Sequence, residues 1–175
     1  MVVIKLKEIY NRVIEEFKPT KYTLYCDMDG VLVDFEKRFE DTTGLSPNAF
    51  RDKYGLDEFW KLIDDEGVRF WVGMGWMPDG EKLWNYIKPN VYSLLSSPSW
   101  DNSSRLGKRL WVKNNIPGTK LILAARKNKQ DYSEKGAILI DDLKQTIDEW
   151  NAKGGIGILH TSAESTIKQL KELGL

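Results

Sequence analysis

Five short segments of the chain are almost continuously apolar, and turn-forming or charged residues bound each of them. The segments are Tyr22–Cys26, Val91–Leu95, Lys120–Ala124, Ala137–Ile140 and Ile156–His160. Such runs are typical of strands that are covered on both faces in a parallel sheet. Helical patterns occupy Ser103–Asn115, Leu143–Ala152 and Ala163–Leu173. This alternation predicts an α/β fold with a Rossmann-like, doubly wound parallel sheet whose core strands are these five segments.

The gap between the first two expected strands is unusually long. About 60 residues separate them, which is far more than one crossover helix requires. Helix-like patterns recur in this gap, at Phe35–Thr43, Asn48–Tyr54, Glu58–Glu66 and Gly80–Ile87. We therefore expect residues 35–87 to form a helical insertion that covers the sheet as a small cap, and residues 20–34 and 88–175 to form the core domain.

Residues 1–19 have the pattern of an amphipathic helix. Their apolar positions recur every three or four residues, at Val2, Leu6, Ile9, Val13 and Phe17, and Pro19 ends the pattern. We expect this helix to pack on the core domain. Binding to a partner or to a second copy of the chain is the alternative.

The composition limits the classes of partner. Lys plus Arg and Asp plus Glu both number 26, so the chain has no net charge and lacks the basic footprint that long nucleic acids require. No stretch approaches the roughly 18 apolar residues of a membrane span, and early charges argue against a signal peptide. Cys26 is the only cysteine, so no intrachain disulfide can form. We expect a cytoplasmic protein without a membrane association.

Acidic and hydroxyl side chains follow three of the expected strands. These residues are Asp27 and Asp29 after the first strand, Ser96 and Ser97 at the end of the second, and Asp141 and Asp142 at the end of the fourth. Ligands of open α/β sheets bind beyond the carboxyl ends of the strands, where these groups converge. Clustered carboxylates repel one another unless a cation is present, and Mg²⁺ prefers oxygen ligands. Gly30 allows the sharp turn behind the first acidic pair.

These residues resemble the motifs of the haloacid dehalogenase (HAD) superfamily. The stretch Asp27-Met28-Asp29-Gly30-Val31-Leu32 is similar to its first motif, Ser96 to its second, and Asp141-Asp142 to its acidic fourth. The likeness is greater to the 5'(3')-deoxyribonucleotidase branch, through Ser96-Ser97-Pro98, Lys108-Arg109-Leu110-Trp111-Val112 and Leu139-Ile140-Asp141-Asp142. Ala125 departs from the threonine that this branch often places before the arginine at Arg126.

The resemblance implies a role for each matching residue. Asp27 would be the nucleophile and Asp29 the general acid and base, with the Asp29 carbonyl rather than its carboxylate on the metal. The metal would be Mg²⁺, held by Asp27, Asp29, Asp141 and Asp142. Ser96, Ser97 and Gly30 would bind phosphate. The cap would be of the small C1 type.

The choice of the catalytic lysine is open from spacing alone. The resemblance favours Lys108, which would neutralise charge on Asp27 and on the transferred phosphoryl group. Lys113, Lys120 and Lys135 lie in the same interval and remain alternatives. Arg126 is expected to contact substrate rather than to take part in the chemistry.

The insertion is rich in aromatic residues, and we expect most of them to form the core of the cap. The segment from Phe70 to Pro78 also contains two glycines and has no helical period, which suggests a loop near the site. Aromatic side chains in such a loop can stack on a nucleobase. Phe35, Trp71 and Trp76 are therefore candidate pocket residues.

The sequence thus favours a Mg²⁺-dependent phosphomonoester hydrolase that uses an aspartyl-phosphate, with a (deoxy)nucleoside monophosphate as its substrate. A phosphatase for a sugar phosphate or a polynucleotide end is one alternative. A non-catalytic module that binds a phosphorylated ligand or a partner is another, although such a module has no need of both Asp27 and Asp29.

Overall fold

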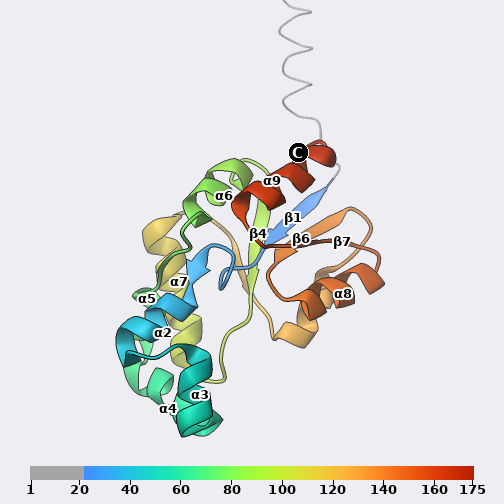
Figure 1. The fold of residues 1–175 in the computed structure, drawn as a ribbon. Helices are drawn as coiled ribbons and strands as arrows, with labels where there is room; N and C mark the ends of the chain where they lie inside the picture. Colours follow the sequence, from blue (N-terminus) through green and yellow to red (C-terminus); the bar gives the residue numbers. More distant parts are fainter. Residues whose placement is uncertain (1–21) are drawn as a thin grey trace, which may run out of the picture.

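The computed structural model describes residues 22–175, so the helix expected over residues 1–19 lies outside the described part of the chain. Parallel strands form one sheet in the order β5–β4–β1–β6–β7, which confirms the predicted fold class (Figure 1). The strands are β1 (Thr23–Cys26), β4 (Val91–Ser96), β5 (Leu121–Leu123), β6 (Ala137–Asp141) and β7 (Ile156–Leu159). The strand order reverses beside β1, and this is where open α/β sheets bind ligands.

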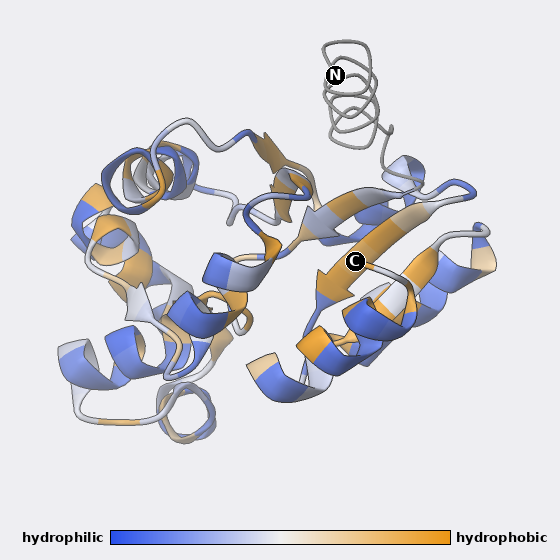
Figure 2. Ribbon diagram, turned by 90° about the horizontal axis from the view of Figure 1, so that it is seen from above, coloured by the Kyte–Doolittle hydropathy of each residue, from blue (hydrophilic) through white to orange (hydrophobic). Residues whose placement is uncertain are grey.

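Helices cover both faces of the sheet. In chain order, helix α6 (Gly80–Ile87) precedes β4. Helices α7 (Asn102–Asn115), α8 (Lys144–Ala152) and α9 (Ala163–Glu172) follow it. Because side chains alternate along a strand, Leu24 and Cys26 pack in one apolar cluster with residues of α6, α7 and α9, while Tyr25 packs in a second cluster with Trp150 of α8. In Figure 2 the central strands are largely hydrophobic and the helices carry hydrophilic residues.

The insertion begins with four helices, which lie together at one end of the molecule (Figure 1). They are α2 (Phe35–Thr43), α3 (Pro47–Tyr54), α4 (Leu56–Glu66) and α5 (Val68–Val72). Asp34 and Ser46 cap α2 and α3 through side-chain bonds to backbone N–H groups. Two short antiparallel strands, β2 (Val33–Asp34) and β3 (Gly75–Trp76), close the base of the cap. No helix within residues 22–175 combines the length and apolarity needed to cross a membrane.

Helix α6 is bound to elements of the core domain. It packs against α9, and the Tyr86 hydroxyl donates to the Leu175 carbonyl at 2.6 Å. The Asp79 carboxylate, just before α6, accepts from the Ala163 amide at 2.6 Å. The amphipathic pattern of α6 identified its buried face but could not identify the surface that this face covers. We therefore propose that the cap ends before Gly80, whereas residues 35–87 were expected to form it.

The cap is joined to the core by close packing between α5 and α7. A Cβ at Gly107 would lie 2.3 Å from the Trp71 Cβ, so only glycine permits this approach. The apolar residues of the cap are continuous with those of the sheet, and the cap has no separate core. The expected loop from Phe70 to Pro78 is wrong in part, because its first residues complete α5 and Gly75–Trp76 form β3.

Candidate active site

The register of the sheet brings acids from two strands together. Cys26 of β1 pairs with Ile140 of β6, and the Asp27 amide donates to the Ile140 carbonyl at 2.9 Å. Asp27 consequently lies beside Asp141, and Asp142 follows. Carboxylate oxygens of these three aspartates lie within 4.8 Å of one another. Convergence of the two strand ends, expected from the sequence, is thus seen directly.

Gly30 makes room for one of these acids. Its φ is +73°, and a Cβ at this position would lie 2.4 Å from Asp142 Oδ2. The Gly30 amide donates to the Val33 carbonyl at 2.9 Å, so in this conformation it is not available to the phosphate that we expected it to bind. Gly30 instead allows the turn after Asp29 to close against Asp142.

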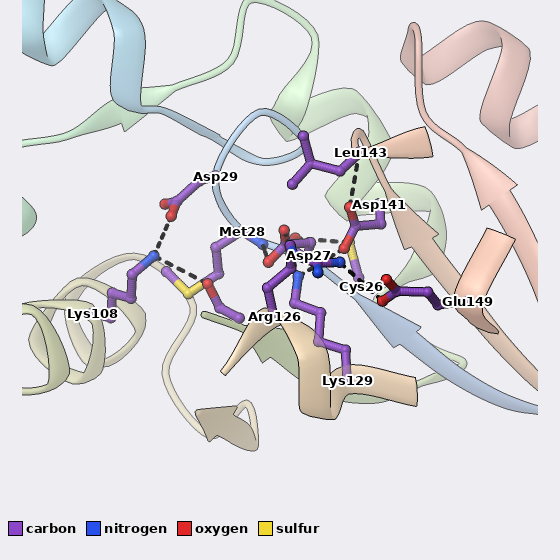
Figure 3. Close-up of polar contacts among 11 residues, drawn as sticks. Cys26, Asp27, Met28, Asp29, Lys108, Arg126, Lys129, Asp141, Leu143 and Glu149 are labelled. Carbon is purple, nitrogen blue, oxygen red and sulfur yellow. Dashed lines mark hydrogen bonds and ion pairs between the residues drawn. The ribbon is translucent and has the colours of Figure 1, made fainter. Parts of the chain in front are cut away.

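Lys129, which is not among the lysines expected at the site, neutralises part of this acidic group. Its Nζ lies 2.8 Å from Asp27 Oδ2 and 2.7 Å from Asp141 Oδ2, and its side chain is buried (Figure 3). It lies on the 3₁₀ helix η1 (Arg126–Tyr132). With three residues per turn, η1 points Arg126 and Lys129 in the same direction, and both line one cavity. The three-residue spacing of Arg126 and Lys129, just after β5, is the sequence feature that could have identified Lys129.

The acidic group retains an excess of negative charge. Burial, together with the charge on Asp27, raises the pKa of Asp141 to about 6 and that of Asp142 to about 7. Burial alone would lower the pKa of Lys129, but Asp27 and Asp141 outweigh it and the pKa lies above its ordinary value. When all three carboxyl groups are ionised, one ammonium leaves two negative charges uncompensated, and burial together with this repulsion raises the two pKa values. This donor set fits a divalent cation that prefers oxygen ligands.

Asp29 lies in a different environment from Asp27. Its carboxylate pairs with Lys108 of α7, whose Nζ also donates to the Ser96 hydroxyl at 3.0 Å. The Asp29 side chain is not one of the three clustered carboxylates. Lys108 therefore contacts Asp29, whereas the amine beside Asp27 comes from Lys129 instead of Lys108. Figure 3 shows these as two separate groups.

The environment of Asp29 suits proton exchange. Burial raises its pKa, and the charge on Lys108 opposes that shift. Its Oδ1 has no hydrogen-bond partner among the described residues. A carboxyl group whose protonated form is favoured by burial can donate a proton near neutral pH.

A cavity of about 700 Å³ lies over these groups. Its polar lining includes Asp27, Asp29, Asp142, Ser97, Arg126 and Lys129. The Ser97 hydroxyl has no partner among the described residues. Arg126 Nη1 is 2.9 Å from Glu149 Oε2, and this ion pair holds the guanidinium at the cavity wall.

The aromatic lining of the cavity differs from the expected set. Of the three candidate pocket residues, Phe35 and Trp71 line it and Trp76 does not. The Trp76 ring lies 5.0 Å from the Trp111 ring, at the base of the cap. Trp60 of α4 and Trp100, in the loop after β4, line the cavity instead. The hydrophobic pattern could not predict that Trp60 and Trp100 line the cavity. It indicates neither which face of α4 is turned toward the cavity nor the path of the loop after β4.

No protein-family model matches the sequence, and no curated protein matches it. Solved structures do match it in shape. A HAD-superfamily hydrolase from Geobacter sulfurreducens is 12% identical and has a TM-score of 0.54; the match covers 88% of this chain and 99% of that one. The chain has a HAD-like fold.

Two further structures agree with this HAD-like fold. A HAD phosphatase from Thermococcus onnurineus is 13% identical over 87% of this chain and 97% of its own, with a TM-score of 0.52. A HAD hydrolase from Bacillus subtilis, bound to magnesium, is 12% identical over the same shares, with a TM-score of 0.51. At this identity the likeness establishes the fold, and the chemistry must be argued from the residues of this chain.

Proposed function

We propose that this HAD-like protein is a phosphomonoester hydrolase that uses Mg²⁺ and an aspartyl-phosphate intermediate. One observation carries the proposal: two aspartates of a single loop, Asp27 and Asp29, lie in opposite environments. Asp27 belongs to the clustered carboxylates, while Asp29 pairs with Lys108. These different environments support the assignment of Asp27 as the nucleophile and of Asp29 as the group that exchanges a proton.

The proposed reaction has two displacements. A carboxylate oxygen of Asp27 attacks phosphorus, the bond to the leaving oxygen breaks, and Asp29 gives its proton to that oxygen. Asp29 then takes a proton from water, which attacks the phosphorus of the aspartyl-phosphate and releases inorganic phosphate and Asp27. Ser97 would hold a phosphate oxygen, because its hydroxyl lines the cavity without a partner among the described residues. Ser96, which was expected to share this role, is buried, is hydrogen-bonded to Lys108 and does not line the cavity. Lys129 would offset charge beside the nucleophile.

A magnesium ion fits the acidic group. Asp27, Asp141 and Asp142 would hold it, with the Asp29 carbonyl as the further ligand that the family resemblance implies. When bound, Mg²⁺ neutralises charge on phosphate oxygens. The uncompensated negative charge of the group and the raised pKa of Asp142 support this assignment.

A nucleoside monophosphate is the substrate that the cavity supports best. Its floor is polar and its walls carry Phe35, Trp60, Trp71 and Trp100, so a phosphate and an aromatic base would each meet a suitable surface. A volume of about 700 Å³ lies within the range of small-molecule sites. The balanced net charge favours a small metabolite over a long nucleic acid.

The test is a phosphate-release screen over nucleoside monophosphates and sugar phosphates, with Mg²⁺ or with a chelator. We expect Mg²⁺-dependent release, and a loss of roughly a thousandfold or more in Asp27→Asn. Asp148→Asn, on the exposed face of α8, is the matched control. Unchanged activity of Asp27→Asn would remove it as the nucleophile. Cleavage of sugar phosphates without any nucleotide would reject the substrate assignment.

A further inference from the structure

The aromatic residues of the cavity differ in how much of each ring is free. The Phe35 ring lies 5.4 Å from the Phe70 ring and 5.9 Å from the Trp71 ring. Trp71 is 2% exposed, and the Lys108 ammonium lies 5.2 Å from its ring centre. These two rings are already packed within the cap and against α7. A planar ligand would have to displace existing contacts to stack fully on either of them.

Trp100 is the opposite case. Its side chain is fully exposed and makes no aromatic or cation–π contact with any described residue, yet it lines the cavity above the acidic group. The whole apolar surface of this ring is available to a partner, and its place in the lining of the cavity makes that partner a planar ligand bound there.

The loop that carries Trp100 is held at both sides. The Asp101 carboxylate accepts from the Ser103 amide at 2.7 Å and caps α7. The Ser104 hydroxyl donates to the Asp101 carbonyl at 2.9 Å and contacts the Ser99 carbonyl at 3.5 Å. Fixing the backbone on either side of Trp100 lowers the entropy cost of presenting its ring to a ligand.

Cap helix α4 contributes Trp60 to the lining of the same cavity, where the Trp60 side chain is half-buried. The loop after β4 contributes Trp100. The cavity lining thus combines a tryptophan from cap helix α4 with one from the core domain.

We propose that Trp100 stacks on the aromatic base of the substrate and sets the preference for nucleotides over phosphoesters of non-aromatic alcohols. This assignment rests on the proposed function, because it assumes that the phosphate occupies the cavity floor. Stacking of a base on an aromatic side chain is worth roughly 5- to 100-fold in affinity. Since the base is remote from phosphorus, the gain belongs to binding and changes KM more than kcat.

The first experiment compares kcat/KM for nucleoside monophosphates with kcat/KM for glycerol 2-phosphate. In Trp100→Ala we expect this ratio to fall roughly tenfold, mainly through a higher KM for nucleotides. Trp100→Phe should restore most of it, because phenylalanine keeps a stacking face. Tyr92→Ala is the control, since Tyr92 is a half-exposed aromatic residue that does not line this cavity.

The second experiment measures binding without turnover. Calorimetric titration of a nucleoside monophosphate into Asp27→Asn and into Asp27→Asn/Trp100→Ala should show a roughly tenfold weaker Kd in the double variant. An unchanged substrate ratio and an unchanged Kd would overturn the assignment. An equal loss for both substrate classes would do so too, because it would mean that Trp100 only supports the loop. If no phosphoester is cleaved, the proposed function fails, and the titration still decides whether Trp100 binds the base.

Discussion

Lys129 and Lys108 both reach the carboxyl edge of the sheet, and each pairs with an aspartate of the loop after β1. Lys129 comes from η1 and bridges Asp27 and Asp141, in a group that also contains Asp142. Negative charge exceeds positive charge there, so the group can attract a cation.

In the Lys108–Asp29 pair, one positive charge faces one negative charge. Lys108 pairs with Asp29 alone, and its other neighbours are the Ser96 hydroxyl and the Trp71 ring. Asp29 therefore needs no further cation and can change its protonation against a fixed positive charge. Two carboxylates of one short loop thus acquire different chemistry from the lysines and acids that other elements bring to them.

Removal of Lys129 should break the larger group. Lys129→Met leaves Asp27 and Asp141 buried without their shared ammonium, and we expect the free energy of unfolding to fall by about 3–5 kcal/mol in the absence of metal. Urea denaturation monitored by circular dichroism measures this loss. Lys127→Met, an exposed site on the same 3₁₀ helix, should change little. A loss no larger in Lys129→Met than in Lys127→Met would contradict the comparison.

Added Mg²⁺ should stabilise the protein through the Asp27, Asp141 and Asp142 group and not through the Asp29–Lys108 pair. A ligand present at a hundredfold excess over its Kd stabilises a protein by about 2.7 kcal/mol, and we expect a gain of this order for the wild type. Asp142→Asn should lose most of it, because the clustered carboxylates lose one member. Asp29→Asn should keep it. Equal losses in both variants, seen by denaturation with and without Mg²⁺, would show that the two aspartates share one site.

Removal of Lys108 should cost less than removal of Lys129. Its single charged partner, Asp29, retains 30% side-chain exposure and can be protonated or hydrated. We expect Lys108→Met to lower the free energy of unfolding by about 1–2 kcal/mol. Lys113→Met, on the exposed side of α7, serves as the control. If Lys108→Met lowers the free energy of unfolding as much as Lys129→Met does, the Lys108–Asp29 pair does not contribute less to stability than the contacts of Lys129 with Asp27 and Asp141.

The pH dependence of either pair can be interpreted only after the contribution of His160 is removed. Burial lowers the pKa of His160, whose Nδ1 lies 2.8 Å from the Thr166 hydroxyl. The unfolded chain then binds the proton more readily. His160 should therefore lower the free energy of unfolding as the pH drops below about 6.5, by at most about 1.4 kcal/mol per unit, whereas the raised pKa values of Asp141 and Asp142 contribute with the opposite sign. His160→Gln should remove the His160 contribution, so that the slopes of the wild type and the variant differ between pH 7 and 5; identical slopes would exclude it.

The features predicted well from sequence are those fixed by backbone pattern. A continuous apolar strand such as Ala137–Asp141 admits few arrangements, and parallel pairing with β1 brings Asp27 beside Asp141. The features that were missed depend on side-chain approach. Lys129 lies on a short 3₁₀ segment without apolar periodicity, and the exposure of Trp100 leaves no trace in a hydrophobic pattern.

The contact between Gly30 and Asp142 joins two distant parts of the chain through shape alone. A Cβ at position 30 would occupy space now held by the Asp142 carboxylate, so a side chain there would require Asp142 to move. A single methyl group there would displace an acid without altering any ionisable residue. A substitution at position 30 would therefore disrupt the site by steric displacement of Asp142, while every charged residue of the site is retained.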